Sequence, residues 1–296
     1  MSRFKQILSD IGLVYSAAIW GSTFFIVKNS LDYIAPLALI AYRFLFASLF
    51  LFIYLKVKKI KVFKDFKKGL LLSFILFGVF FPQTVGLKIT TASNSGFITG
   101  LFIIFVPFIS WMFYKKRPPI IKIISVAIAV SGLWILTGGI DRANGGDYLT
   151  LITAVFYALH IVAVGKIMNS GMNPYVLTFQ QFFGIGLLSL IAAPLVGSSL
   201  CWSSGSVIPI IIFLAIFPSL SAFLIQTVVQ KYTSPVKVAI IFSFEPLFAA
   251  IFSWTIGGEK FFLIKGLGGG MMVIAFILSE FPFARFKKTI EKQYLP

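Results

Sequence analysis

The chain consists of long apolar stretches separated by short polar connections. A helix needs about 20 apolar residues to cross the hydrocarbon core of a bilayer. Ten stretches qualify, at residues 11–29, 36–55, 69–88, 94–114, 119–138, 147–168, 174–197, 207–230, 236–256 and 261–282. They lack the alternation of apolar and polar residues that is typical of barrel strands. The pattern therefore predicts an all-α membrane protein with ten transmembrane helices and no soluble domain.

Composition supports this prediction. Hydrophobic residues make up 58% of the chain and charged residues 12%, whereas soluble domains have about 45–50% and about 25%. The net charge of +17 would suggest nucleic acid in a soluble protein, but most Lys and Arg lie in short runs between apolar stretches. Membrane proteins keep their orienting charges there. We therefore expect the lipid bilayer as a partner, and no nucleic acid.

The basic residues predict the orientation of the chain. They cluster before the first stretch, in the second and fourth connections, and in the C-terminal tail. The residues are Arg3, Lys5, Lys56, Lys58, Lys59, Lys61, Lys64, Lys67, Lys68, Lys115, Lys116, Arg117, Lys122, Arg285, Lys287, Lys288 and Lys292. With ten spans these positions share one side, and the positive-inside rule makes that side cytoplasmic. We expect both termini in the cytoplasm and a location in the cytoplasmic (inner or plasma) membrane.

One phrase occurs twice in the sequence. Phe80–Thr90 and Phe223–Thr233 share six of eleven residues in register, including a glutamine and a lysine. The spacing from Lys28 to Pro36 also recurs, between Lys166 and Pro174. A shared apolar composition would not preserve these polar positions, so the matches indicate an internal duplication.

The duplication predicts two units, residues 1–143 and 144–296, each with five helices. Because five is odd, the second unit enters the membrane in the opposite orientation, so Lys88 and Lys231 should lie on opposite sides. Secondary transporters are often built this way, with the substrate site near the midplane between the repeats. We expect a central cavity lined by helices 1, 3, 4, 6, 8 and 9, with helices 5 and 10 at the periphery.

Several motifs resemble the EamA family of the drug/metabolite transporter superfamily. They are WGSTFFIVK (Trp20–Lys28), RFLFA (Arg43–Ala47), GLKITTASNSGFITGLFIIFVPF (Gly86–Phe108), QKYTSPVKVAIIFSFEPLFAAIFSW (Gln230–Trp254) and GGE (Gly257–Glu259). The resemblance extends over about residues 8–283. It implies ten helices in two inverted repeats around a central cavity, and export or exchange of small metabolites, amino acids prominent among them.

Two ionisable residues lie deep within the predicted spans. Glu245 is nine residues from one border of its stretch, roughly 14 Å, and Arg43 is seven residues from the opposite border, roughly 10 Å. An ionisable group inside a membrane marks a functional site by default. The two could pair, either as a structural ion pair or as part of a substrate site. If they are functional, Glu245 exchanges a proton or a substrate ammonium as the cavity opens; otherwise it only holds its helix.

Other polar and aromatic residues complete the predicted cavity. An amide in hydrocarbon needs a partner, so glutamines should point inward, together with the aromatic residues that share their helical faces. The candidates are Trp20, Phe80, Gln83, Asn94, Phe97, Tyr157, His160, Gln181, Phe223 and Gln226. His160 is either a hydrogen-bonded core residue or a proton relay. Prolines inside the stretches predict kinks or hinges, at Pro82, Pro107, Pro218 and Pro246.

The leading function is a secondary transporter for small amphipathic metabolites. The alternatives are a channel or facilitator without ion coupling and, less favoured, an intramembrane enzyme. Catalysis is not expected, because the sequence has no second deep carboxylate beside Glu245 and no evident nucleophile with a base. With one histidine and one cysteine we expect no metal site, and no motif implies a cofactor. Gly266-x-x-x-Gly270 allows close helix packing, within a monomer or in a weak homodimer.

Overall fold

The computed structural model describes residues 3–115, 120–137, 143–242 and 244–280. Within these ranges the chain forms helices, and its extended pairing is a single isolated bridge between Ile34 and Trp202. Some of the basic residues that predict orientation lie outside the described residues. They are Lys116, Arg117, Arg285, Lys287, Lys288 and Lys292.

The elements follow the predicted stretches closely. The first half contains α1 (Arg3–Ser30), α2 (Pro36–Val57), α3 (Phe66–Leu87), α4 (Ala92–Gly100), α5 (Phe102–Tyr114) and α6 (Ile120–Thr137). The second half contains α7 (Gly145–Asn169), α8 (Pro174–Leu195), α9 (Val207–Leu214), the π-helix η2 (Ala215–Ser221), α10 (Ala222–Gln230), α11 (Pro235–Phe242), α12 (Glu245–Thr255) and α13 (Leu263–Glu280).

Grouped by the ten predicted stretches, the described elements make ten helical segments, because three stretches contain more than one element. They are α4 with α5, α9 with η2 and α10, and α11 with α12. Seven segments of the described chain are long and apolar enough to cross a bilayer, and shorter apolar helices lie within α6 and α13. The predicted all-α membrane fold is confirmed.

The repeated Lys-to-Pro spacing has a local structural reason. Each lysine lies in the last turn of its helix, Lys28 in α1 and Lys166 in α7. Each proline lies in the first turn of the next helix, Pro36 in α2 and Pro174 in α8. Proline is tolerated in the first turn because the N–H that it lacks would have no partner within the helix. A lysine is favoured in the last turn because its positive charge interacts with the negative end of the helix dipole. The spacing therefore marks the same helix–turn–helix connection in both halves.

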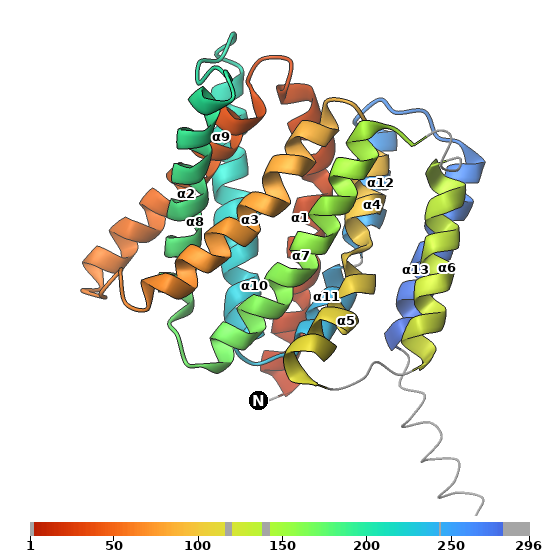
Figure 1. Ribbon diagram of the computed structural model, residues 1–296, viewed down its shortest axis with the longest axis horizontal. Helices are drawn as coiled ribbons and strands as arrows, with labels where there is room; N and C mark the ends of the chain where they lie inside the picture. The colour runs from red at the N-terminus through yellow and green to blue at the C-terminus, as the bar shows by residue number, and fades with distance from the viewer. Residues whose placement is uncertain (1–2, 116–119, 138–142, 243, 281–296) are drawn as a thin grey trace, which may run out of the picture.

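The two halves interleave rather than lying side by side. Helices of the first half pack on helices of the second: α1 on α12, α2 on α8, and α3 on α7. In Figure 1, α3 and α7 run beside one another across the middle of the molecule, while α6 and α13 lie together at one edge. This arrangement agrees with the expected peripheral position of the fifth and tenth helices.

Glycines allow α1, α4 and α12 to approach closely near the centre. A Cβ added at Gly100 in α4 would lie 2.3 Å from Pro246 Cγ. At Gly96 it would lie 2.5 Å from the Cβ of Ala249 in α12, and at Gly21 in α1 it would lie 2.9 Å from the carbonyl oxygen of Glu245. Side chains at these positions would separate the helices, so the glycines fix where the first turn of α12 stands.

One of the four predicted proline kinks needs correction. Pro107 lies inside α5, and its segment also breaks six residues earlier, between Gly100 and Phe102. Pro246 lies in the first turn of α12 and starts a helix there instead of bending one. Pro82 is accommodated within α3, and Pro218 lies inside η2. The positions at which these segments break are therefore not set by proline alone.

Candidate functional site

A small cavity lies where helices from both halves meet. Its walls come from α1, α2, α3, α4, α7, α10 and α12, and its lining residues are Trp20, Thr23, Phe24, Arg43, Val79, Phe80, Gln83, Thr99, Tyr157, Phe223 and Glu245. The free volume is about 30 Å³, which is enough for a water molecule and far below the hundreds of Å³ typical of ligand pockets. In this conformation the cavity is too small to hold a metabolite.

Arg43 reaches the cavity from α2 and is only 4% exposed. Its Nε donates a hydrogen bond of 2.9 Å to Ser219 Oγ in η2. The guanidinium carbon lies 4.8 Å from the ring centroid of Phe80 and 5.0 Å from that of Phe44. Cation–π contacts and one hydrogen bond hold the cation, so its other donors remain available to a ligand.

Glu245 reaches the same cavity from the first turn of α12 and is also 4% exposed. A carboxylate in this position is favoured by the positive end of the helix dipole. The Tyr157 hydroxyl lies close enough to the Glu245 carboxyl group to interact with it electrostatically. Glu245 Oε2 and the Tyr157 hydroxyl oxygen have no hydrogen-bond partner within the described ranges. Buried polar groups without partners are costly, so this pair is poised to accept one.

The expected pairing of Arg43 with Glu245 is not formed in this conformation. Ion pairs in the described part of the chain join Lys68 to Asp65 and Lys237 to Asp10. Arg43 instead binds η2 and two aromatic rings. One cavity therefore contains a basic and an acidic side chain that do not bond to each other.

Aromatic side chains form the apolar wall between these charges. The Trp20 ring lies 4.9 Å from Phe223 and 6.0 Å from Tyr157, centroid to centroid. Trp20 Nε1 donates to the Pro218 carbonyl oxygen at 2.7 Å. Trp20 and Arg43 thus both bind the π-helical turn, a deformation that often marks functional sites. The wall suits the apolar part of an amphipathic molecule.

Four lining residues were missed by sequence reasoning: Thr23, Phe24, Val79 and Thr99. Helical spacing could have found three of them, since Thr23 and Phe24 follow Trp20 by three and four residues and Val79 precedes Gln83 by four. Thr99 is identified by its contact, because Gln83 Nε2 donates to its Oγ1 at 3.1 Å. Helix α2 was also absent from the expected lining helices, although its Arg43 was among the candidates.

Five predicted residues lie away from this cavity. His160 Nε2 and Gln181 Oε1 are 2.9 Å apart in the buried interface of α7 and α8. Gln226 donates to Gln230 Oε1 at 3.0 Å within α10. The Asn94 side chain lies near Lys265 Nζ, at 3.5 Å. The Phe97 ring is buried and packs against Gly269 of α13, where an added Cβ would lie 2.7 Å from the ring.

The reason for these placements is that polar residues in a helix bundle also bind one another. His160 and Gln181 partner across two helices, and Gln226 partners along one. We expected both glutamines of the repeated phrase to face the cavity. Gln83 does so, whereas Gln226 does not line it and binds Gln230 instead.

Comparison with known proteins agrees with the architecture. The model of the EamA-like transporter family matches the chain twice, over residues 7–138 and 144–281. An "uncharacterized transporter" of Archaeoglobus fulgidus is 34% identical over 93% of this chain and 86% of its own length. The inner membrane transporter YedA of Escherichia coli K12 is 24% identical over 93% of this chain and 92% of its own.

A solved crystal structure has the same fold. It superposes with a TM-score of 0.73 over 93% of this chain and 97% of the other chain, at 16% sequence identity. The resemblance to EamA transporters is thereby confirmed, and with it a multi-pass membrane protein of the transporter class. The chain belongs to the EamA-like transporter family.

Proposed function

We propose that this chain is a secondary transporter that moves amino acids or related amphipathic metabolites out of the cell by alternating access. The observation that carries the proposal is that one aromatic cavity buries a basic and an acidic side chain, Arg43 and Glu245, which do not bond to each other. A zwitterion with an apolar side chain complements all three features. Its carboxylate would bind Arg43, its ammonium would bind Glu245, and its side chain would contact the aromatic wall.

The transport cycle requires the closed cavity to open toward each side in turn. The free volume of about 30 Å³ does not admit a metabolite, so binding must be accompanied by separation of the helices around it. The break between α4 and α5 lies beside Thr99, which lines the cavity, and supplies a place for such movement. A cavity too small for a metabolite favours a transporter over an open channel.

Energy coupling is assigned to Glu245. Its unpartnered oxygen can accept either a proton or a substrate ammonium, but one carboxylate cannot hold both. A proton entering from one side would therefore displace the substrate, which gives an exchange mechanism. Without this competition the protein would be a facilitator that moves its substrate down a gradient.

The proposal includes the orientation and organisation inferred from the sequence. The five-helix units are residues 1–143 and 144–296, the termini are cytoplasmic, and the membrane is the cytoplasmic (inner or plasma) membrane. Export is then movement from the side of Lys231 to the side of Lys88. The chain acts as a monomer or a weak homodimer.

Proteoliposomes test the substrate class. Uptake of a labelled apolar amino acid would be compared with uptake of the amine that lacks its carboxylate and of the acid that lacks its ammonium. The zwitterion should be transported at least tenfold faster than either analogue, because each analogue leaves one buried charge unpaired, which costs about 1–3 kcal/mol or more. Equal rates for all three compounds would exclude recognition by two charges.

Variants of Arg43 and Glu245 test whether these two residues distinguish the zwitterion from the amine and the acid. Arg43→Gln should lower transport of the zwitterion to the level of the amine, and Glu245→Gln should lower it to the level of the acid. If both variants keep the wild-type preference, the substrate binds elsewhere.

A further inference from the structure

A second feature of the molecule is independent of the transport cavity. The connection between α2 and α3 is strongly basic, with lysines at positions 56, 58, 59, 61, 64, 67 and 68 against a single acid, Asp65. It borders two hollows at the end of the bundle. One, of about 880 Å³, is lined by Lys56, Lys59, Ile60, Lys61, Val62, Phe63 and Lys64. The other, of about 400 Å³, lies between this connection and the α7–α8 turn and is lined by Ile60, Lys61, Lys64, Asp65, Ser170, Gly171, Met172, Asn173 and Val176.

The connection is held in a defined shape. Gln180 of α8 is fully buried, and its Nε2 donates hydrogen bonds of 2.8 Å to the carbonyl oxygens of Val62 and Lys64. Val62 is itself buried, at 7% exposure. Lys59 and Asp65 have positive φ angles of 54° and 53°, which residues other than glycine adopt rarely and only where their surroundings require it. The lysines are therefore presented by a fixed turn rather than by a loose tail.

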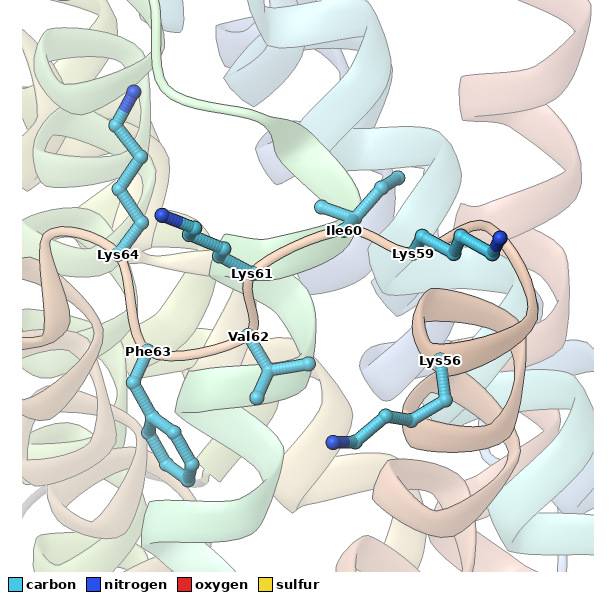
Figure 2. A pocket seen from close by; sticks show the side chains of 7 residues that line it. All are labelled: Lys56, Lys59, Ile60, Lys61, Val62, Phe63 and Lys64. Carbon is cyan, nitrogen blue, oxygen red and sulfur yellow. The ribbon is translucent and has the colours of Figure 1, made fainter.

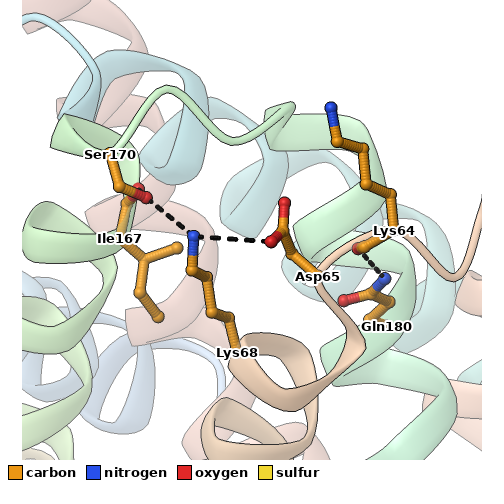
Figure 3. Close-up of polar contacts among 6 residues, drawn as sticks. All are labelled: Lys64, Asp65, Lys68, Ile167, Ser170 and Gln180. Carbon is orange, nitrogen blue, oxygen red and sulfur yellow. Dashed lines mark hydrogen bonds and ion pairs between the residues drawn. The ribbon is translucent and has the colours of Figure 1, made fainter.

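Two lysines line both hollows. Lys61 and Lys64 project from the same part of the turn, with their side chains on one side of it (Figure 2). The acid beside them is already occupied, because Asp65 pairs with Lys68 at 3.8 Å and Lys68 also donates to Ser170 Oγ at 3.1 Å (Figure 3). Within the described residues, Lys61 and Lys64 form no ion pair. Their charges are therefore available to an anion.

The same turn presents apolar surface on its other side. Phe63 is 59% exposed and points away from the Lys64 ammonium group (Figure 2). Its ring lies 6.3 Å from Phe179 of α8 and 5.7 Å from Phe66. Because Phe179 belongs to a membrane-crossing helix, this contact places Phe63 toward the hydrocarbon and the lysines toward the headgroups.

We propose that this turn binds the headgroup of an anionic phospholipid. The phosphate would lie between Lys61 and Lys64, in the hollow beside the α7–α8 turn, and an acyl chain would pass along Phe63 and Phe66. Charge complementarity supports a lipid of this class, since juxtamembrane lysines attract the anionic lipids of the adjacent leaflet. Gln180 acts as a positioning residue, because it holds the backbone of the turn and touches no lipid.

Native mass spectrometry of the purified full-length chain in detergent tests the site. Phosphatidylglycerol should bind more tightly than zwitterionic phosphatidylcholine. The double variant Lys61→Gln/Lys64→Gln should weaken phosphatidylglycerol binding roughly ten- to thirtyfold. The matched control is Lys58→Gln/Lys67→Gln, which removes the same charge from exposed lysines that line neither hollow, and it should weaken binding less than about threefold. Equal losses of affinity in the two double variants would show that the lysines attract anionic lipid only through their total charge, and would contradict a specific site at Lys61 and Lys64.

Two further arms separate the possible explanations. Gln180→Ala leaves the charge unchanged but releases the turn, so it should weaken phosphatidylglycerol binding while transport of the substrate continues. Unchanged lipid affinity in this variant would contradict an ordered site.

Inorganic phosphate at millimolar concentration should not displace the lipid, since it lacks the contact with Phe63. Displacement by phosphate, or equal binding of phosphatidylcholine, would overturn the assignment to an anionic lipid.

Discussion

The two copies of the Gln-Thr-Val phrase occupy different environments. In α3, Gln83 is half-buried, lines the central cavity and donates to Thr99. In α10, Gln226 is fully buried and donates to Gln230. The helices also differ, since α3 is continuous whereas α10 follows the π-helical turn η2. The same residues in the same register therefore line a small cavity in one half and a fully buried interface in the other.

This difference teaches that a repeated sequence does not require a symmetric structure. In the proposed inverted repeat, Gln83 and Gln226 would approach the centre from opposite ends of the membrane. A transporter that alternates access does not give both ends the same surroundings at once. We therefore expect the asymmetry between the glutamines to belong to a single conformation of the transport cycle.

The largest expected effect contrasts a carboxylate in the cavity with an exposed carboxylate outside it. Glu245→Gln keeps the shape but removes the charge, so the protein should fold yet lose the response of transport to an imposed pH gradient. The control is Asp10→Asn, which removes an exposed ion pair of 2.7 Å with Lys237; such pairs contribute little, so the response should persist. Proteoliposome flux measures both. A wild-type protein with no response to the gradient would show that proton coupling is absent.

The next effect contrasts glycines at the centre and at the edge. Gly100→Ala would place a Cβ 2.3 Å from Pro246, and relieving such overpacking typically costs about 1–3 kcal/mol. Gly270→Ala is the control, since nothing lies within 4 Å of the added atom. Thermal unfolding in detergent should show a lower midpoint for the first variant and an unchanged midpoint for the second. Equal midpoints would mean that the α4–α12 contact is not close.

The smallest effect concerns the glutamines themselves. Gln226→Ala leaves the buried Gln230 Oε1 without its partner, which should lower the free energy of unfolding by about 1–3 kcal/mol while leaving the KM for substrate unchanged. Gln83→Ala exposes Thr99 to a cavity that admits water, so stability should change by less than about 1 kcal/mol while KM rises. If Gln226→Ala raised KM and Gln83→Ala lowered stability instead, Gln226 rather than Gln83 would line the substrate cavity.

Much of the fold could be predicted because the membrane restricts it. Runs of about 20 apolar residues can only be spanning helices, and the ten runs correspond to the ten segments found. The predicted stretches that begin at residues 36 and 174 match the starts of α2 and α8. The break at Gly100 could not be predicted, because it depends on where Pro246 lies across the bundle.

The candidate site was partly predictable for the same kind of reason. Glu245, Arg43 and Gln83 stand out because polar groups in hydrocarbon need partners. Their actual partners are tertiary, and no spacing identifies Ser219 for Arg43. His160 and Gln181 carry the same signal and turn out to bind each other, since a bundle interface satisfies polar groups as well as a cavity does.

Cysteine accessibility at positions 83 and 226 tests alternating access most directly. In a Cys201→Ser background, Gln83→Cys and Gln226→Cys would be labelled with a membrane-impermeant maleimide in right-side-out and inside-out vesicles, with and without substrate. We predict that position 83 reacts only from the side of Lys88 and position 226 only from the side of Lys231, and that substrate changes the two rates in opposite directions. Labelling of both cysteines from one side, or rates that rise and fall together, would contradict the account.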